Sequence, residues 1–201
     1  MTDKQYSITP RLYEALQLTI DLFGHDARKS SPVPALSHLL SVCAMVQFDG
    51  GDEDEAIAAL LHDTLEDKPQ FITREEIQKR FGARVLEIIE VSTDTPQDYQ
   101  GGPKPPWRER KQGYLDHVRK TDPALLRVTI ADKVDNVRAI LADHQQIGGA
   151  LWQRFNAGQA DQAWNYQEAV KAYEQAGFQS PLLKELKRLV TELSALPIDP
   201  L

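Results

Sequence analysis

The sequence predicts an all-α fold, a single domain built as a bundle of about eight to ten helices. Apolar residues recur at steps of three and four along almost the whole chain, which is the spacing of one helix face. Glycines and prolines interrupt these stripes, and no segment alternates apolar and polar residues as a half-buried strand does. We expect one domain over residues 1–201, with a core at about 10–175 and a C-terminal helix at about 180–196.

The first two helices are predicted from their apolar stripes. Thr9 followed by Pro10 is a helix-start signal, because proline at the first helical position loses no needed hydrogen-bond donor. The stripe of this first helix is Leu12, Leu16, Ile20 and Phe23. The second stripe is Leu36, Leu39, Leu40, Cys43 and Val46. Gly50 and Gly51 then end the second helix.

A third helix is expected to begin at Asp52, with Glu55 three residues on at the spacing of a capping box. Residues 56–61 are apolar on nearly all sides, so this helix should be buried. Thr73 and Glu76 repeat the cap spacing, and the helix that they begin ends at Gly82. A further short helix is indicated by Val85, Ile88 and Ile89.

Residues 93–106 hold four prolines and two adjacent glycines, which predicts a long loop, and loops of this length are often functional. A helix resumes near Trp107, and Asp122 with Pro123 begins the next one. Its buried stripe is Leu126, Ile130, Val134, Val137 and Leu141. The last helix begins near Pro181, and its stripe is Leu183, Leu186, Leu189, Val190 and Leu193.

Composition excludes several classes of function. The net charge of −7 argues against a nucleic-acid partner, because phosphate binding needs a basic surface. No run of about 18 apolar residues predicts a membrane span, and the first ten residues lack the apolar core of a secretory signal. Cys43 is the single cysteine, so no internal disulfide forms, which fits a reducing cytoplasm. The sequence leaves the oligomeric state open, a homo-oligomer included.

The segment HDTLED, residues 62–67, is the most informative one for chemistry. It is expected to form the last turn of the buried third helix, and on a helix residues three or four apart share a face, as His62 and Glu66 would. Carboxylates near a helix C-terminus are disfavoured, and like charges at one site repel each other. A bound cation would reverse both penalties, although a helix end that frays into solvent is an equally good explanation of this segment alone.

Two further polar residues complete a candidate metal site. His38 lies on the second helix, and Asp132 interrupts an otherwise apolar helix, where a buried carboxylate needs a partner. Together with His62 and Asp63 they give two histidines and two aspartates from three helices, a set that suits a divalent transition metal. No cysteine belongs to the set, which disfavours a structural zinc site. Taken singly, each residue is more often an ordinary core or surface residue.

His…HD…Asp in this order resembles the HD superfamily of metal-dependent phosphohydrolases, and one branch is matched further. RKSSPVPALSH (28–38) resembles the RK-x-PY-x-x-H segment of RelA/SpoT hydrolase domains, and AALLHDTLED (58–67) resembles their AALLHDxxED. FGARVLEIIEVSTD (81–94) is similar to their FG-x-x-V stretch, and ADKVDNVRAIL (131–141) to their AD(K/R)xxNxR. The similarity spans roughly residues 10–175, and Ala35 replaces the tyrosine of the first motif, which puts base preference in doubt.

The resemblance implies a small alarmone hydrolase without a synthetase domain. Its metal ligands, for Mn²⁺ as the expected ion, would be His38, His62, Asp63 and Asp132. Glu66 and Asp67 match the catalytic pair, which handles the protons of the attacking water and the leaving oxygen. The reaction implied is release of pyrophosphate from the 3′ position of ppGpp or pppGpp.

The resemblance also implies positions for substrate binding. Arg28 and Lys29 match the nucleotide pocket, and Asn136 matches an asparagine that contacts the ribose. On charge alone, a solvated surface patch is the more common explanation of Lys104, Arg108 and Arg110, and further phosphate contacts are the alternative. The aromatic residues that would either close the pocket or belong to the core are Trp152, Trp164 and Tyr166.

Two rival functions remain open from the sequence. The first keeps the chemistry and changes the substrate to (p)ppApp, NADPH, a deoxynucleoside triphosphate or a nucleoside monophosphate. The second is a nucleotide sensor without catalysis, which would be expected to lack a metal ligand or one of the paired carboxylates. All of these residues are present here, which favours an enzyme.

Overall fold

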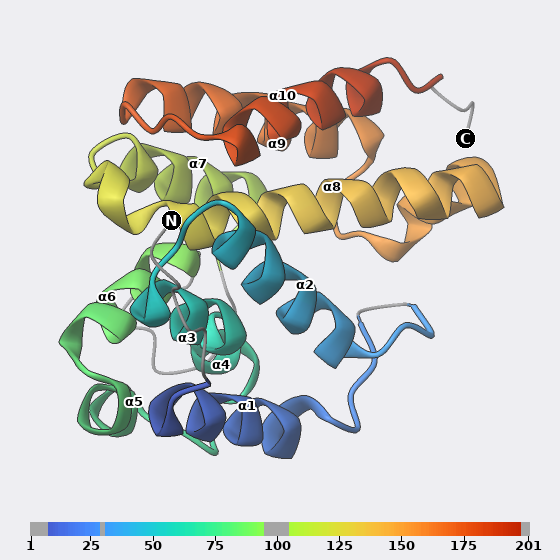
Figure 1. The fold of residues 1–201 in the computed structure, drawn as a ribbon. Coiled ribbons are helices and arrows are strands. Elements are labelled where there is room, and N and C mark those ends of the chain that lie inside the picture. The colour runs from blue at the N-terminus through green and yellow to red at the C-terminus, as the bar shows by residue number, and fades with distance from the viewer. Residues whose placement is uncertain (1–7, 29–30, 95–104, 198–201) are drawn as a thin grey trace, which may run out of the picture.

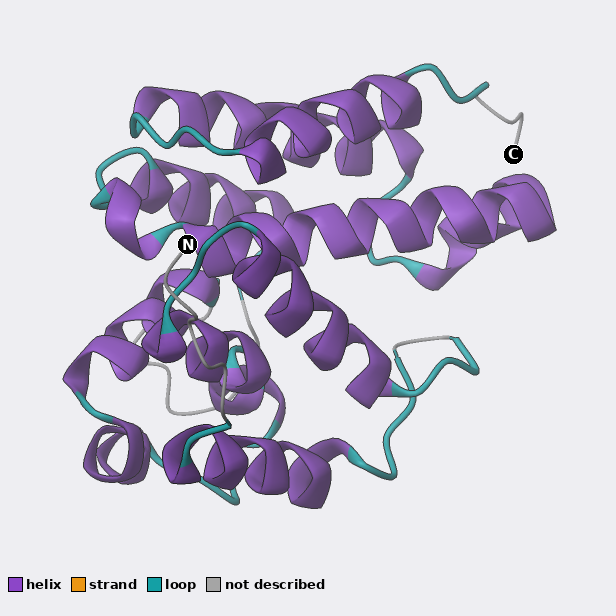
Figure 2. Ribbon diagram, viewed as in Figure 1, coloured by secondary structure: helices purple, strands orange, loops and turns teal. Residues whose placement is uncertain are grey.

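The computed structural model of the chain describes residues 8–28, 31–94 and 105–197. Helices make up its regular structure, and no strand occurs in these ranges, so the all-α prediction is confirmed (Figure 2). The α-helices are α1 (Pro10–Phe23), α2 (Ala35–Phe48), α3 (Glu53–Leu61), α4 (Thr64–Asp67), α5 (Arg74–Phe81), α6 (Ala83–Ser92), α7 (Trp107–Val118), α8 (Arg127–Ile147), α9 (Gln159–Gln175) and α10 (Pro181–Ser194). Two 3-10 helices, η1 (Pro123–Leu125) and η2 (Gly148–Arg154), flank α8.

The longest helix, α8, runs through the middle of the molecule (Figure 1). Helices α9 and α10 lie along one side of it, and α1 to α6 lie on the other. Its direct neighbours include α2 and α10, while α3 packs between α1, α2 and α6. Residues 56–61 of α3 are all buried, as their composition predicts. The same burial places the end of α3 deep in the molecule, beside α2 and α8.

Side-chain caps start the helices where the sequence predicts them. The Thr9 hydroxyl accepts a hydrogen bond from the backbone N–H of Leu12 at 3.1 Å, and Pro10 follows it. Asp52 forms a complete capping box with Glu55, as does Thr73 with Glu76. Each such cap stabilises its helix by about 1 kcal/mol. Gly82, with φ of 94°, separates α5 from α6, and a side chain there would be strained.

Two details of the predicted stripes are wrong. Ile20 and Leu40 are 48% and 44% exposed. The face of α1 that meets α3 instead carries the small residues Ala15 and Thr19, because a small side chain lets the two backbones come close. Thr19 donates from its hydroxyl to the Ala15 and Leu60 carbonyls at 2.8 and 3.3 Å.

The start of α8 also differs from the prediction. The Asp122 carboxylate accepts from the backbone N–H of Ala124 at 2.9 Å and starts η1, not an α-helix, and α8 begins at Arg127. The predicted stripe of α8 is nevertheless buried from Leu126 to Leu141. Within the described residues, no helix is both long and apolar enough to cross a membrane.

Candidate metal centre and adjoining cavity

The segment 62–67 does not continue α3, contrary to the sequence-based prediction of one helix. Helix α3 ends at Leu61, His62 is its C-terminal cap, and the short helix α4 follows from Thr64. The buried Thr64 hydroxyl donates to the Leu61 carbonyl at 2.6 Å, which satisfies a carbonyl at the end of α3 and lets the chain turn. As a result Asp63 lies back against His62, while Glu66 and Asp67 line a cavity beside them.

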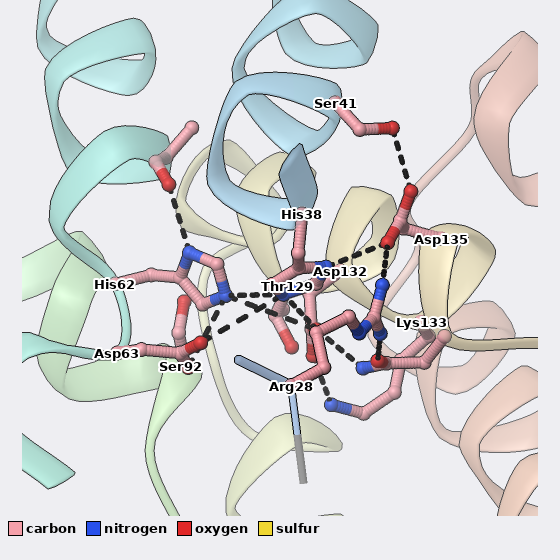
Figure 3. Close-up of polar contacts among 12 residues, drawn as sticks. Arg28, His38, Ser41, His62, Asp63, Ser92, Thr129, Asp132, Lys133 and Asp135 are labelled. Atoms are coloured by element: carbon pink, nitrogen blue, oxygen red, sulfur yellow. Dashed lines mark hydrogen bonds and ion pairs between the residues drawn. The ribbon is translucent and has the colours of Figure 1, made fainter. Parts of the chain in front are cut away.

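Four side chains from three parts of the chain, His38, His62 with Asp63, and Asp132, come together at this turn (Figure 3). The Nε2 atoms of His38 and His62 lie 3.3 Å apart. Asp63 Oδ1 lies 3.3 Å from His62 Nε2, and Asp132 Oδ1 lies 3.4 Å from His38 Nε2. His38, His62 and Asp132 are only 7%, 3% and 7% exposed, and each offers one ligand atom to a shared point.

This geometry fits a single divalent cation. Ligand atoms at about 2.1 Å from one metal lie roughly 3.0–3.5 Å from one another, close to the separations found here. The other ring nitrogen of each histidine is already engaged. His62 Nδ1 lies 2.8 Å from the Ala59 carbonyl, and His38 Nδ1 lies 2.6 Å from Asp135 Oδ2. Because both oxygens can only accept, each Nδ1 carries the proton and each Nε2 lone pair faces the shared point.

The charges around the cluster favour a cation. Burial acts to lower the pKa of His38, but hydrogen bonds to Asp132 and Asp135 outweigh it and raise that pKa to about 9. The pKa of His62 is raised as well, since Asp63 and Asp132 outweigh its burial. Both rings therefore lie in a negative potential that attracts positive charge, and a divalent metal can take the place of protons there.

A cavity of about 370 Å³ opens beside the cluster. Glu66 and Asp67 line it next to Asp63. Its other walls carry cationic side chains, namely Arg28, Arg110, Lys111 and Lys133. One compartment therefore combines paired carboxylates, a candidate metal centre and basic groups, which is the arrangement that metal-assisted hydrolysis of a phosphate compound needs.

Each basic group in the wall already has an acidic partner. Arg28 donates to Asp135 at 2.8 Å and to the side-chain oxygen of Asn136 at 2.7 Å. Lys133 donates to Asp132 at 2.6 Å. Asp94 accepts hydrogen bonds from two cations of α7, Arg110 and Lys111, at 2.7 Å each. These pairs hold the cationic side chains in place in the wall of the cavity.

The other residues predicted to bind substrate either lie outside the described ranges or do not line the cavity. Lys29 and Lys104 lie outside the described residues. Arg108 is exposed, where it pairs with Asp161 and lies over the ring of Trp164, and it is not among the lining residues. Tyr166 is buried in α9 and does not line the cavity.

Sequence reasoning missed three functional candidates in this site. Trp107, not Trp152, contributes an aromatic wall. Lys133 stands in the matched ADK motif, so its position beside Asp132 was the available signal. Asp135 falls at a position that the motif leaves unspecified, and only the fold brings it to His38.

Comparisons with known proteins are consistent with this site. A family model described as HD domain matches residues 15–155. The chain is 36% identical over 130 residues to the guanosine-3′,5′-bis(diphosphate) 3′-pyrophosphohydrolase MESH1 of Xenopus tropicalis, covering 63% of this chain and 68% of that protein. It is 32% identical over 132 residues to the guanosine-3′,5′-bis(diphosphate) 3′-pyrophosphohydrolase of Aquifex aeolicus, covering 64% of this chain and 18% of that protein.

Solved structures share the fold. The crystal structure of lmo0812 from Listeria monocytogenes superimposes with a TM-score of 0.67 at 27% identity, covering 78% of this chain and 97% of that chain. A structure described as a metazoan ortholog of SpoT that hydrolyzes ppGpp has a TM-score of 0.73 at 22% identity, covering 96% and 99%. At that identity the second likeness shows the fold alone.

Proposed function

The chain belongs to the HD domain family, and from this premise we propose that it is a metal-dependent hydrolase that removes the 3′-pyrophosphate of (p)ppGpp. The observation that carries the proposal is the convergence of His38, His62 and Asp132 beside the paired carboxylates Glu66 and Asp67, in a cavity with basic walls. Asp63 lies against His62 and is the fourth proposed ligand. Relatives named guanosine-3′,5′-bis(diphosphate) 3′-pyrophosphohydrolase support the choice of substrate. We place the enzyme in the reducing cytoplasm, which its single, buried cysteine supports.

His38, His62, Asp63 and Asp132 would hold the metal, and we propose Mn²⁺ as the ion. A divalent metal at this position lowers the pKa of a water molecule and offsets negative charge on a phosphate. Mn²⁺ accepts both imidazole and carboxylate ligands, so the donor set suits it. The chain's own contribution is to fix both histidine rings through their Nδ1 atoms.

Glu66 and Asp67 supply the proton transfers. Water adds its oxygen to the phosphorus attached to the ribose O3′, and the bond from that phosphorus to O3′ breaks. One carboxylate takes the proton of the water, and the leaving O3′ receives a proton, so the products are pyrophosphate and GDP or GTP. Both side chains line the same cavity as Asp63, which supports this role.

The basic wall binds and orients the nucleotide. Arg110 and Lys111 face the cavity from α7 and are suited to the outer phosphates, while Arg28 and Asn136 lie side by side at the ribose and base end. A nucleotide can draw on these cations by displacing their present partners. Ala35 also lines the cavity, so a small side chain stands at the position that would otherwise restrict the base.

The test is a substrate panel with purified protein stripped of metal and then supplied with Mn²⁺. The panel holds ppGpp, (p)ppApp, NADPH and deoxynucleoside triphosphates, and products are identified by chromatography. We expect pyrophosphate and GDP from ppGpp. Cleavage of another member in preference to ppGpp would keep the metal chemistry and replace the substrate. Binding of ppGpp without cleavage of any member would favour a sensor.

A further inference from the structure

Asp135 makes three polar contacts beside the candidate metal centre (Figure 3). It lies on α8 between Asp132 and Asn136 and is mostly buried. Its Oδ2 accepts from His38 Nδ1 at 2.6 Å and from Arg28 Nη1 at 2.8 Å. Its Oδ1 accepts from the Ser41 hydroxyl at 2.6 Å. Two of these three donors, His38 and Ser41, lie on α2, and the third, Arg28, lies in the segment that precedes α2.

The two histidines of the cluster are held in different ways. His62 donates to a backbone carbonyl, whereas His38 donates to a charged side chain. A carboxylate on the far nitrogen of a metal-binding imidazole fixes the tautomer and the ring rotation and makes the ligand nitrogen more basic. His38 depends on Asp135 for all three effects, since this is the partner of its Nδ1.

We propose that Asp135 is a positioning residue for the metal centre, which holds His38 for the metal and links it to Arg28. The inference rests on the proposed function, because it assigns His38 to the metal. Arg28 and His38 share one oxygen of Asp135, so the arginine at the nucleotide end and a metal ligand are joined by one carboxylate. Ser41, one turn after His38 on α2, fixes the other oxygen and prevents the carboxylate from rotating away.

The competing explanation is that Asp135 only fastens α2 to α8 by ordinary hydrogen bonds. The positioning role and the purely structural role predict different effects of the variant Asp135→Asn. An asparagine keeps the shape and the capacity to accept from His38 but removes the charge. A positioning role predicts weaker metal binding by roughly tenfold to a hundredfold. A purely structural role predicts a lower melting temperature of the metal-free protein with unchanged metal affinity.

The experiment measures the Mn²⁺ affinity of metal-free protein by competition with a fluorescent chelator. The matched control is Asp143→Asn, which removes a charge from the same helix at a residue paired with Arg154 at 3.2 Å. We expect wild-type affinity for Asp143→Asn, weaker binding for Asp135→Asn and the weakest for Asp135→Ala. Melting temperatures of the metal-free proteins show whether each variant is folded.

Wild-type affinity in both folded Asp135 variants would overturn the proposal. A wild-type protein that binds no Mn²⁺ would overturn it together with the metal centre. The assay contains no nucleotide, so its result does not depend on which substrate the enzyme cleaves. Failure of the proposed substrate and failure of the role of Asp135 are thereby separated.

Discussion

The cavity has two halves that differ in how the chain builds them. The proposed metal-binding half consists of His38 on α2, His62 and Asp63 after α3, and Asp132 on α8. The two histidines and Asp132 are buried, and their ligand atoms lie 3.3 to 3.8 Å apart. The proposed nucleotide-binding half consists of cations that line the cavity, and each is already paired with a carboxylate. One half is organised before any ligand arrives, whereas the other must exchange its ion pairs for phosphates.

This difference separates the expected effects of substitution. Changes in the metal-binding half should abolish metal content or kcat, because chemistry needs fixed geometry. Changes in the basic wall should act mainly on KM, because a lost phosphate contact weakens binding without altering the reacting groups. Variants of the first half therefore test the effect on metal content and kcat, and variants of the second half test the effect on KM.

The largest effect is expected for Asp132→Ala. This change removes a buried ligand and leaves Lys133 without its partner, so Mn²⁺ affinity should fall by more than roughly a hundredfold and turnover with it. Metal content by mass spectrometry, with circular dichroism as a check on folding, measures this. A folded variant with unchanged metal content would break the proposed ligand set.

Glu66→Gln and Asp67→Asn should lose turnover while keeping the metal. Both residues line the cavity, and neither is assigned to the metal, so we expect kcat to fall by roughly 10²–10⁴-fold at wild-type metal content. Steady-state kinetics with saturating Mn²⁺ measures the change. Full activity in both variants would remove the acid and base assigned to them.

Arg28→Gln changes a residue of the basic wall and should affect KM without lowering metal affinity. We expect KM for ppGpp to rise roughly tenfold to a hundredfold, because a charged hydrogen-bond donor is lost from the nucleotide end. Mn²⁺ affinity should not fall, since the contact of Asp135 with His38 remains. An unchanged KM together with a lower kcat would place Arg28 in the chemistry and blur the distinction.

The smallest effect is expected for Arg108→Ala. Its guanidinium lies on the surface over Trp164, so kcat and KM should stay within about twofold of wild type. The matched variant Arg110→Ala, from the same helix but at the cavity wall, should raise KM more. Equal effects in the two variants would mean that the cavity seen here is not the phosphate site.

The residues that converge at the candidate metal centre could be picked out from the sequence because they lie in short motifs on helices with clear apolar stripes. His62 and Asp63 follow a fully apolar segment, and Asp132 stands out within another. The break between α3 and α4 was not foreseen, since it depends on the buried hydroxyl of Thr64 at the helix end. From their spacing alone, residues 62–67 are predicted to continue the helix without a break.

The basic residues that line the cavity were harder to predict because charge along the chain does not say which way a side chain faces. Arg108 and Arg110 lie two residues apart on α7, and so on different faces; only Arg110 lines the cavity. Asp135 and Asp94 were missed because their partners are distant in sequence and meet them only after packing. The buried face of α9 combines Ala169, Ala172 and Tyr173 with the polar Gln162 and Asn165.

The most direct test of the account is a titration of metal-free protein with Mn²⁺ while pyrophosphate release from ppGpp is followed. The account predicts no turnover without metal, and turnover that rises with bound Mn²⁺ and saturates at one ion per chain. Turnover that persists in the metal-free protein, or its absence once one ion is bound, would contradict the claim that the buried histidine and aspartate cluster holds a catalytic metal.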